Sequence, residues 1–89
     1  MAIVREVVIP NREGLHFRPI MRFVDTAQRF QARVKVHCEG READSRSPME
    51  LLMLVATHGS KIRLEAEGDD AEAAIEALSA LIESGFGEQ

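Results

Sequence analysis

The chain has 89 residues, of which 45% are hydrophobic and 29% are charged, and this balance argues against an intrinsically disordered protein. The length predicts one domain over residues 1–89, and no apolar run approaches the roughly 20 residues that cross a bilayer. The net charge is −4, yet residues 1–41 hold eight of the eleven basic and only four of the fifteen acidic side chains. This asymmetry suggests a basic face for phosphate or an acidic partner, although the charges could equally solvate exposed surfaces.

The remaining composition narrows the class of protein. The single cysteine, Cys38, excludes an internal disulfide and a cysteine-based metal cage, and it fits a reducing cytoplasm. Three scattered histidines form no metal motif, and no nucleotide-binding glycine motif occurs, so no metal or cofactor is expected. Nucleic acid is an unfavourable partner because the whole chain is acidic and lacks Trp and Tyr for base stacking.

The first two predicted elements are a strand and a helix. Residues 3–9 are rich in β-branched side chains and end at Pro10, which predicts a strand. Pro19 lies in the first turn of the next element, where a missing N–H is harmless. That element is an amphipathic helix, because from Phe17 onward apolar residues recur every three or four positions, at Ile20, Phe23, Val24, Ala27 and Phe30.

A hairpin follows this helix. Apolar and polar residues alternate over 32–38, which predicts a strand with one buried face. Glu39 and Gly40 form a tight turn, since glycine readily adopts positive φ, and residues 41–43 return as a short strand.

A short helix and another strand follow the hairpin. Ser47 and Pro48 suit the N-cap and first position of a short helix over 49–55, which is followed by a turn at Gly59. Alternation over 61–67 predicts another strand.

A last helix closes the chain. Asp69 and Asp70 suit its start, its buried stripe lies within 71–82, and Gly85 suits its C-cap. The element order is β-α-β-β-α-β-α, with one apolar stripe for each helix. We therefore expect an α+β open-faced sandwich, with an antiparallel or mixed sheet covered on one face.

The most informative segment for function surrounds His16. This histidine lies at or just before the first turn of the first helix, where backbone N–H groups lack partners and the helix dipole favours an anion. Arg18 adds a guanidinium suited to phosphate oxygens, and Gly14 permits a close approach of the backbone. Imidazole is partly unprotonated near neutral pH and can act as a nucleophile. The segment suits a phosphate held on His16; the alternative is that His16 only caps the helix.

A second candidate is Ser47. Its hydroxyl suits an N-cap, and a phosphate there would add a charge of about −1.5 to −2, which would interfere with docking of an acidic partner. In the short helix that follows, Met49 and Met53 would usually belong to the core, although the same helix could expose Met49 and Leu52 as a docking patch.

These residues resemble the HPr phosphocarriers of the phosphoenolpyruvate-dependent sugar phosphotransferase system. The resemblance spans nearly the whole chain and rests on Gly-Leu-His-x-Arg-Pro at 14–19, the hairpin at Gly40, Ser47, and Glu-Gly-Asp at 67–69. Together with the element order, it predicts a four-stranded, mainly antiparallel sheet with three helices on one face. It implies a cytoplasmic, monomeric carrier rather than an enzyme.

The resemblance also implies roles for individual residues. His16 would accept a phosphoryl group on Nδ1 from enzyme I and pass it to enzyme IIA-type proteins. Arg18 would steady the phosphate, and Ser47 would be the substrate of a regulatory serine kinase and phosphorylase. Docking to partners would involve Phe17, Pro19, Met49 and Leu52.

The chain departs from the family pattern beside both sites. Phe17, Ile20 and Met21 stand where the family usually has small residues, and Pro48 and Glu50 follow Ser47 where an apolar residue and a glycine are usual. These departures keep open a regulatory binding module that is controlled by phosphorylation but has no part in sugar transport. A purely structural domain, with His16 as a cap, is the third reading.

Overall fold

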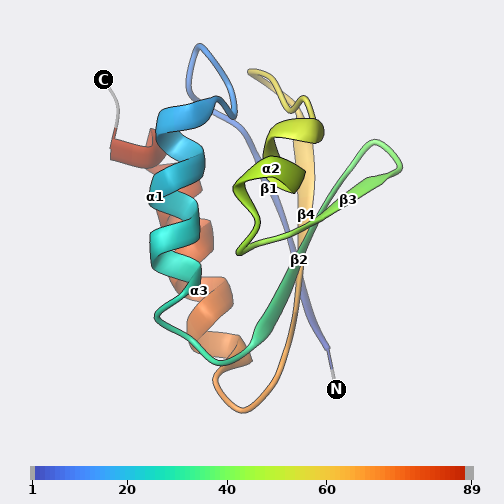
Figure 1. Cartoon of the computed structure of the whole chain (residues 1–89), viewed down its shortest axis with the longest axis vertical. Coiled ribbons are helices and arrows are strands. Elements are labelled where there is room, and N and C mark those ends of the chain that lie inside the picture. Colours follow the sequence, from blue (N-terminus) through green and yellow to red (C-terminus); the bar gives the residue numbers. More distant parts are fainter. Residues whose placement is uncertain (1, 88–89) are drawn as a thin grey trace.

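The computed structural model describes residues 2–87, which form a four-stranded sheet and three α-helices (Figure 1). The strands are β1 (Ile3–Val8), β2 (Arg33–Cys38), β3 (Arg41–Asp44) and β4 (Lys61–Glu67). The helices are α1 (Phe17–Ala27), α2 (Pro48–Met53) and α3 (Ala71–Glu83), followed by a 3-10 turn, η1 (Gly85–Gly87). The strand order is β1-β4-β2-β3 and every neighbouring pair is antiparallel, which confirms the predicted fold class.

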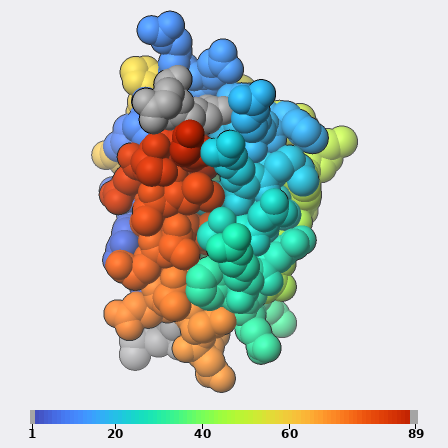
Figure 2. Space-filling view, turned by 90° about the vertical axis from the view of Figure 1, so that its left-hand side faces the viewer, coloured from blue at the N-terminus to red at the C-terminus, as the bar shows by residue number. Residues whose placement is uncertain are grey.

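Helices α1 and α3 lie side by side over one face of the sheet (Figures 1 and 2). Alternation in β2 and β4 decides which side chains meet them, because successive residues of a strand point to opposite faces. The apolar residues of these strands are buried, namely Val34, Val36, Cys38, Ile62, Leu64 and Ala66. The apolar stripe of α1 that the spacing predicted is buried as far as Ala27, the last residue of the helix.

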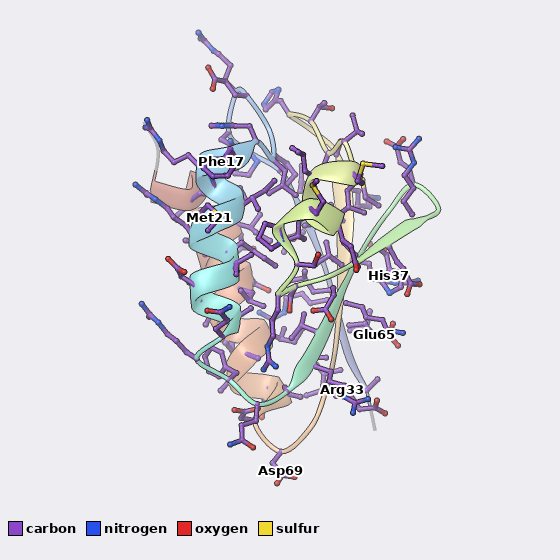
Figure 3. The ribbon with its side chains drawn as sticks, viewed as in Figure 1. Phe17, Met21, Arg33, His37, Glu65 and Asp69 are labelled. Atoms are coloured by element: carbon purple, nitrogen blue, oxygen red, sulfur yellow. The ribbon has the colours of Figure 1, made fainter. Side chains whose placement is uncertain are left out.

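The other face of the sheet carries charged side chains. Arg33 and Lys35 are exposed, whereas His37 is half-buried because its Nε2 lies 2.9 Å from Glu65 Oε1 on β4. Figure 3 shows His37 and Glu65 on the side of the sheet away from the helices.

Two predicted helix ends are wrong by a few residues. Helix α1 ends at Ala27, and Phe30, which was predicted to continue the stripe, packs half-buried against the core from the following turn. Helix α2 covers Pro48–Met53 rather than 49–55, because the N–H groups of Leu54 and Val55 bond three residues back and Val55 has φ +54. The chain turns there because Ala56 must reach the core.

The C-terminal turn was not predicted. Ser84 is the C-cap of α3, so Gly85, which was predicted to be the cap, lies one position beyond it, with φ +72. Phe86 follows with φ +60, a conformation that costs an L-residue about 1–2 kcal/mol. Its side chain is fully buried, and burying a phenylalanine contributes about 1.5–3 kcal/mol, which offsets that cost.

Candidate functional site

The loop between β1 and α1 is held by hydrogen bonds within it and to the segment after α2. The Asn11 side-chain amide donates to the Gly14 carbonyl over 2.7 Å, and the Leu15 N–H donates to the Ala56 carbonyl over 2.9 Å. Gly14 has φ +74, and a Cβ there would lie 2.7 Å from the Ala56 oxygen. Only glycine fits this approach, so Gly14 fixes the chain just before His16.

His16 is the N-cap residue of α1, with φ −105 and ψ −171. Its side chain makes no capping hydrogen bond, so the capping role considered from the sequence is not what this side chain does. The Nε2 atom lies 3.4 Å from Glu13 Oε1, and the side chain is 35% exposed. A carboxylate therefore lies near Nε2, and the imidazole as a whole is partly exposed.

The first turn of α1 presents backbone donors next to His16. The first N–H groups of a helix have no acceptor within it. Here the Ile20 N–H reaches the His16 carbonyl over 3.0 Å and Pro19 has no N–H, which leaves the N–H groups of Phe17 and Arg18 at the helix end. No acidic side chain lies in this turn. The positive end of the helix dipole can therefore stabilise an anion beside the imidazole.

Arginine side chains surround this helix start. Arg12, Arg18 and Arg22 line a groove between the β1–α1 loop, the start of α1 and the end of α3, together with the carboxylates of Glu13 and Glu83. The Arg22 guanidinium donates to a carbonyl of η1, so it ties the C-terminal turn to α1. Arg18 is exposed at the second helical position. It is the guanidinium best placed by sequence to meet an anion attached to the neighbouring histidine.

The predicted capping role of Ser47 is confirmed. Its Oγ accepts a hydrogen bond from the Glu50 N–H over 3.3 Å, and Pro48 occupies the first helical position. The Glu50 carboxylate in turn accepts from the Asp44 N–H over 2.8 Å. The Glu50 side chain thus joins β3 to α2, which gives Glu50, a departure from the family pattern, a structural role in this turn.

Exposed apolar side chains lie on the first turn of α1 and around α2. They are Phe17 (71% exposed), Met49 (71%), Leu52 (47%), Met53 (68%) and Val55 (65%). We call this set the apolar patch. Figure 3 shows Phe17 at the start of α1 and Met21 one turn further along. Pro19, which was expected to contact partners, is fully buried, so the sequence-based expectation for it needs correction.

Sequence reasoning missed two members of the apolar patch, Met53 and Val55, and the expectation that Met49 and Met53 belong to the core is wrong. Helical spacing could have found Met53, because Leu51 and Leu54 are three apart and both buried, which directs the residues between them outward. Val55 could not be found this way, since its direction depends on the positive φ that ends α2.

The described part of the chain holds neither a metal-binding cluster nor a membrane-spanning helix. Within residues 2–87, no group of three or more His, Cys, Asp or Glu side chains is arranged to hold a metal ion. No helix in that same range is long and apolar enough to cross a membrane.

The chain is similar in sequence to known phosphocarrier proteins. The model of the family described as "PTS HPr component phosphorylation site" matches residues 3–84. The phosphocarrier protein NPr of Proteus mirabilis is 45% identical over 89 residues, covering 99% of both chains. The phosphocarrier protein HPr of Xylella fastidiosa is 36% identical over 83 residues, covering 93% of both.

The fold comparison agrees. The crystal structure of HPr-C-His from Thermoanaerobacter tengcongensis superimposes with a TM-score of 0.93 and 40% identity, covering 98% of both chains. The agreement thus extends over sequence, element order and three-dimensional arrangement. The chain belongs to the HPr family of phosphocarriers of the phosphotransferase system.

Proposed function

We propose that His16 accepts a phosphoryl group from enzyme I, with phosphoenolpyruvate as the ultimate donor, and passes it to enzyme IIA-type proteins. The observation that carries this proposal is the imidazole at the N-cap of α1. It makes no capping bond, and it stands beside the N–H groups of Phe17 and Arg18 at the positive end of the helix.

The chemistry follows from the two ring nitrogens. Nucleophilic attack needs a neutral imidazole whose reacting nitrogen has a lone pair. Nε2 lies 3.4 Å from the Glu13 carboxylate, and the resemblance to the HPr phosphocarriers implies that Nδ1 is the reacting nitrogen. We therefore assign Nδ1 as the acceptor. A bond forms between Nδ1 and phosphorus as the bond between phosphorus and the donor's residue breaks, and transfer onward is the same exchange in reverse.

The new phosphoryl group brings negative charge that the helix start can accept. The N–H groups of Phe17 and Arg18 can donate to its oxygens, and the Arg18 guanidinium adds a charge-assisted bond. Such interactions lower the free energy of the phosphorylated form without trapping it, because Arg18 is exposed and its interaction is screened by water. A carrier needs this balance, since it must also release the group.

Docking of the partners is assigned to the apolar patch. Phe17, Met49 and Leu52 were expected there from the sequence, and Met53 and Val55 extend the same surface. Apolar side chains that lie beside a transfer site favour association by losing contact with water. Pro19 is left out because it lies on the buried face of α1.

Regulation at Ser47 is proposed as a second modification of the same chain. A kinase, with a phosphorylase to reverse it, would convert a neutral cap into a dianion next to the Asp44 and Glu50 groups that join β3 to α2. Repulsion there would disturb α2, which carries Met49 and Leu52. The expected outcome is weaker docking of partners rather than loss of His16 chemistry.

The remaining assignments follow from the same role. The chain acts as a cytoplasmic, monomeric carrier that is a substrate of phosphotransfer and turns over no small molecule. It has no nucleic acid, membrane or cofactor partner in this proposal.

The decisive experiment is incubation of the protein with enzyme I and phosphoenolpyruvate, followed by intact-mass analysis. One phosphate that is labile in acid and stable in base is expected, because a phosphorus–nitrogen bond to imidazole hydrolyses in acid. The variant His16→Ala is expected to accept none. Acceptance of that phosphate by His16→Ala would refute the assignment.

A second candidate output is regulation without sugar transport. It is favoured by the 45% identity to a phosphocarrier protein NPr, which suggests a nitrogen-type phosphotransferase role. Competition assays with purified IIA-type proteins of the sugar and nitrogen branches would separate the two. Faster transfer to a sugar-specific acceptor would count against the regulatory output.

A further inference from the structure

A carboxylate stands beside one of the two ring nitrogens of His16. Glu13 Oε1 lies 3.4 Å from His16 Nε2, and within residues 2–87 this is the one ion pair that Glu13 makes. The nitrogen assigned to the phosphate is Nδ1, which a ring carbon separates from Nε2. Glu13 is therefore close to the ring nitrogen that would not bind phosphorus.

The backbone of Glu13 is held by the turn that contains it. The Gly14 N–H donates to the Asn11 carbonyl over 3.2 Å, and the Asn11 side-chain amide donates to the Gly14 carbonyl over 2.7 Å. The His16 N–H donates to the Gly14 carbonyl over 3.1 Å. The Glu13 side chain is 74% exposed, but these bonds hold its backbone close to that of His16. The contact between the two side chains therefore needs little ordering of the loop.

By its charge alone, Glu13 opposes phosphorylation of this site. The first turn of α1 has no acidic side chain, and Arg12, Arg18 and Arg22 line the adjoining groove, which favours an anion. A carboxylate nearby repels an added phosphoryl group, because both are negative. Glu13 favours the phosphorylated form only if the imidazole beside it becomes positive when the phosphate is attached.

The chemistry of transfer gives the ring this positive charge. Before transfer, the neutral ring has its proton on Nε2 and a lone pair on Nδ1. The lone pair forms the bond to phosphorus, while the donor's residue keeps the electron pair of the bond that breaks. The ring then carries both the Nε2 proton and a positive charge. When the acceptor takes the phosphoryl group, the electron pair of the phosphorus–nitrogen bond returns to Nδ1 and the ring is neutral again.

We propose that Glu13 is a positioning residue that stabilises the positive, phosphorylated imidazole of His16 through Nε2. The phosphoryl group is attached at Nδ1, further from the carboxylate than Nε2 is, so attraction to the ring outweighs repulsion of the phosphate. The inference rests on the proposed phosphocarrier function. It adds a residue that raises the phosphorylated share of the carrier at equilibrium, and it requires no proton to enter or leave the ring.

The test measures the equilibrium of phosphoryl exchange. Phosphorylated enzyme I, freed of phosphoenolpyruvate, is mixed with wild type or Glu13→Gln, and intact-mass analysis gives the phosphorylated fraction of the carrier. The equilibrium constant for carrier phosphorylation is expected to fall about two- to five-fold in Glu13→Gln, the range of an exposed ion pair. This difference is expected to shrink at about 1 M salt, which screens charges more than about 3 Å apart. Glu13→Asp keeps the charge and is expected to give an intermediate constant.

The sign of the change separates the contact from overall charge. The matched control is Asp25→Asn, which removes a negative charge from an exposed position on α1. Loss of a distant negative charge weakens repulsion of the phosphate, so this constant is expected to stay unchanged or rise slightly. An unchanged or raised constant in Glu13→Gln overturns the inference, as does an equal fall in both variants.

Nitrogen NMR of the phosphorylated His16 ring gives a readout that a structural role would not move. The Nε2 proton is expected to exchange with water more slowly in wild type than in Glu13→Gln, and equal exchange overturns the inference. If the wild type takes no phosphate on His16, the proposed function itself fails. If it is phosphorylated and the constant of Glu13→Gln is unchanged, that function stands and only the role of Glu13 is rejected.

Discussion

The first turns of α1 and α2 both contain backbone N–H groups that have no acceptor within the helix, and the two helices treat these groups differently. At α2 the Ser47 hydroxyl accepts the Glu50 N–H, proline takes the first position, and Glu50 places a carboxylate in the first turn. At α1 the His16 side chain makes no capping bond and the first turn has no acidic residue. One helix start is satisfied by its own side chains, whereas the other leaves its positive end available for an added anion.

This difference teaches why a histidine at the N-cap can carry a phosphate. A side chain that already caps the helix would have to break its bond to react, which costs free energy. His16 instead has its Nε2 near Glu13, and under the proposed function the N–H groups of Phe17 and Arg18 would meet the phosphoryl oxygens. The comparison predicts that removing His16 affects chemistry more than stability, and that removing Ser47 has the opposite effect.

The largest expected effect is that of His16→Ala. Phosphate uptake should be lost completely, while the free energy of unfolding should change by less than about 1 kcal/mol, since no cap is removed. Intact-mass analysis with enzyme I and phosphoenolpyruvate measures the first, and urea denaturation the second. The matched control, Ser47→Ala, should still take up one phosphate. A severely destabilised His16→Ala protein would mean that the imidazole is structural after all.

A smaller loss, in the rate of phosphoryl transfer, is expected for Arg18→Ala. Without its guanidinium, transfer to and from His16 should slow by about tenfold to a hundredfold, because a charge-assisted bond to the phosphoryl group is lost. Stopped-flow transfer assays measure this rate. Arg29→Ala, beyond the far end of α1, removes an equal charge away from the site and should have little effect. Equal slowing by both variants would show that overall charge, not the position of Arg18, matters.

Removal of the Ser47 cap should lower stability moderately. Ser47→Ala leaves the Glu50 N–H without its acceptor, so the protein should lose about 1 kcal/mol and Tm should fall by about 4–8 °C. Ser47→Asp restores an acceptor at the same place and should recover most of the lost stability. Thermal unfolding by circular dichroism measures both, and identical Tm values for wild type and Ser47→Ala would contradict the capping role.

The smallest expected effect on stability is that of Asp70 at the start of α3, a third helix start that differs from the other two. Its N-cap residue, Asp70, makes no cap bond but accepts the N–H groups of Gln31 and Ala32 over 2.9 and 2.7 Å, tying α3 to the start of β2. The bond from Gln31, opposed by desolvation and joined by the bond from Ala32, holds the pKa of Asp70 below its ordinary value.

The sign of the pH dependence follows from this depressed pKa. The ionised carboxylate stabilises the fold above its unfolded pKa of about 3.9, and that stabilisation is lost as pH falls through the lower folded value. Asp70→Asn should therefore lower Tm at neutral pH, and the difference from wild type should shrink towards about pH 2. Asp69→Asn removes a carboxylate that bonds neither Gln31 nor Ala32. A pH-independent difference for Asp70→Asn would contradict the ionic contribution.

The sequence predicted the elements well because their signals are local. Alternation in β2 and β4 and the helical spacing of α1 follow from the geometry of each element alone. The site was also visible locally, since His16, Arg18 and Pro19 lie within one turn of helix. One error lies where distant segments meet, since Val55 left the helix so that Ala56 could reach Leu15. The burial of Pro19 could have been predicted, because Pro19 lies four residues before Phe23 on the buried stripe of α1.

By itself, the sequence determined the order of elements, the apolar faces and the histidine at a helix start, because periodicity and capping chemistry act over a few residues. Tertiary structure alone decided that Nε2 of His16 faces Glu13, that Gly14 packs on Ala56, and that Met53 and Val55 extend the apolar patch. The approach of Gly14 to Ala56 joins segments about forty residues apart, and it holds the loop in which Glu13 and His16, three residues apart, lie close together. Local preference does not encode such contacts, which form only when the chain buries its core.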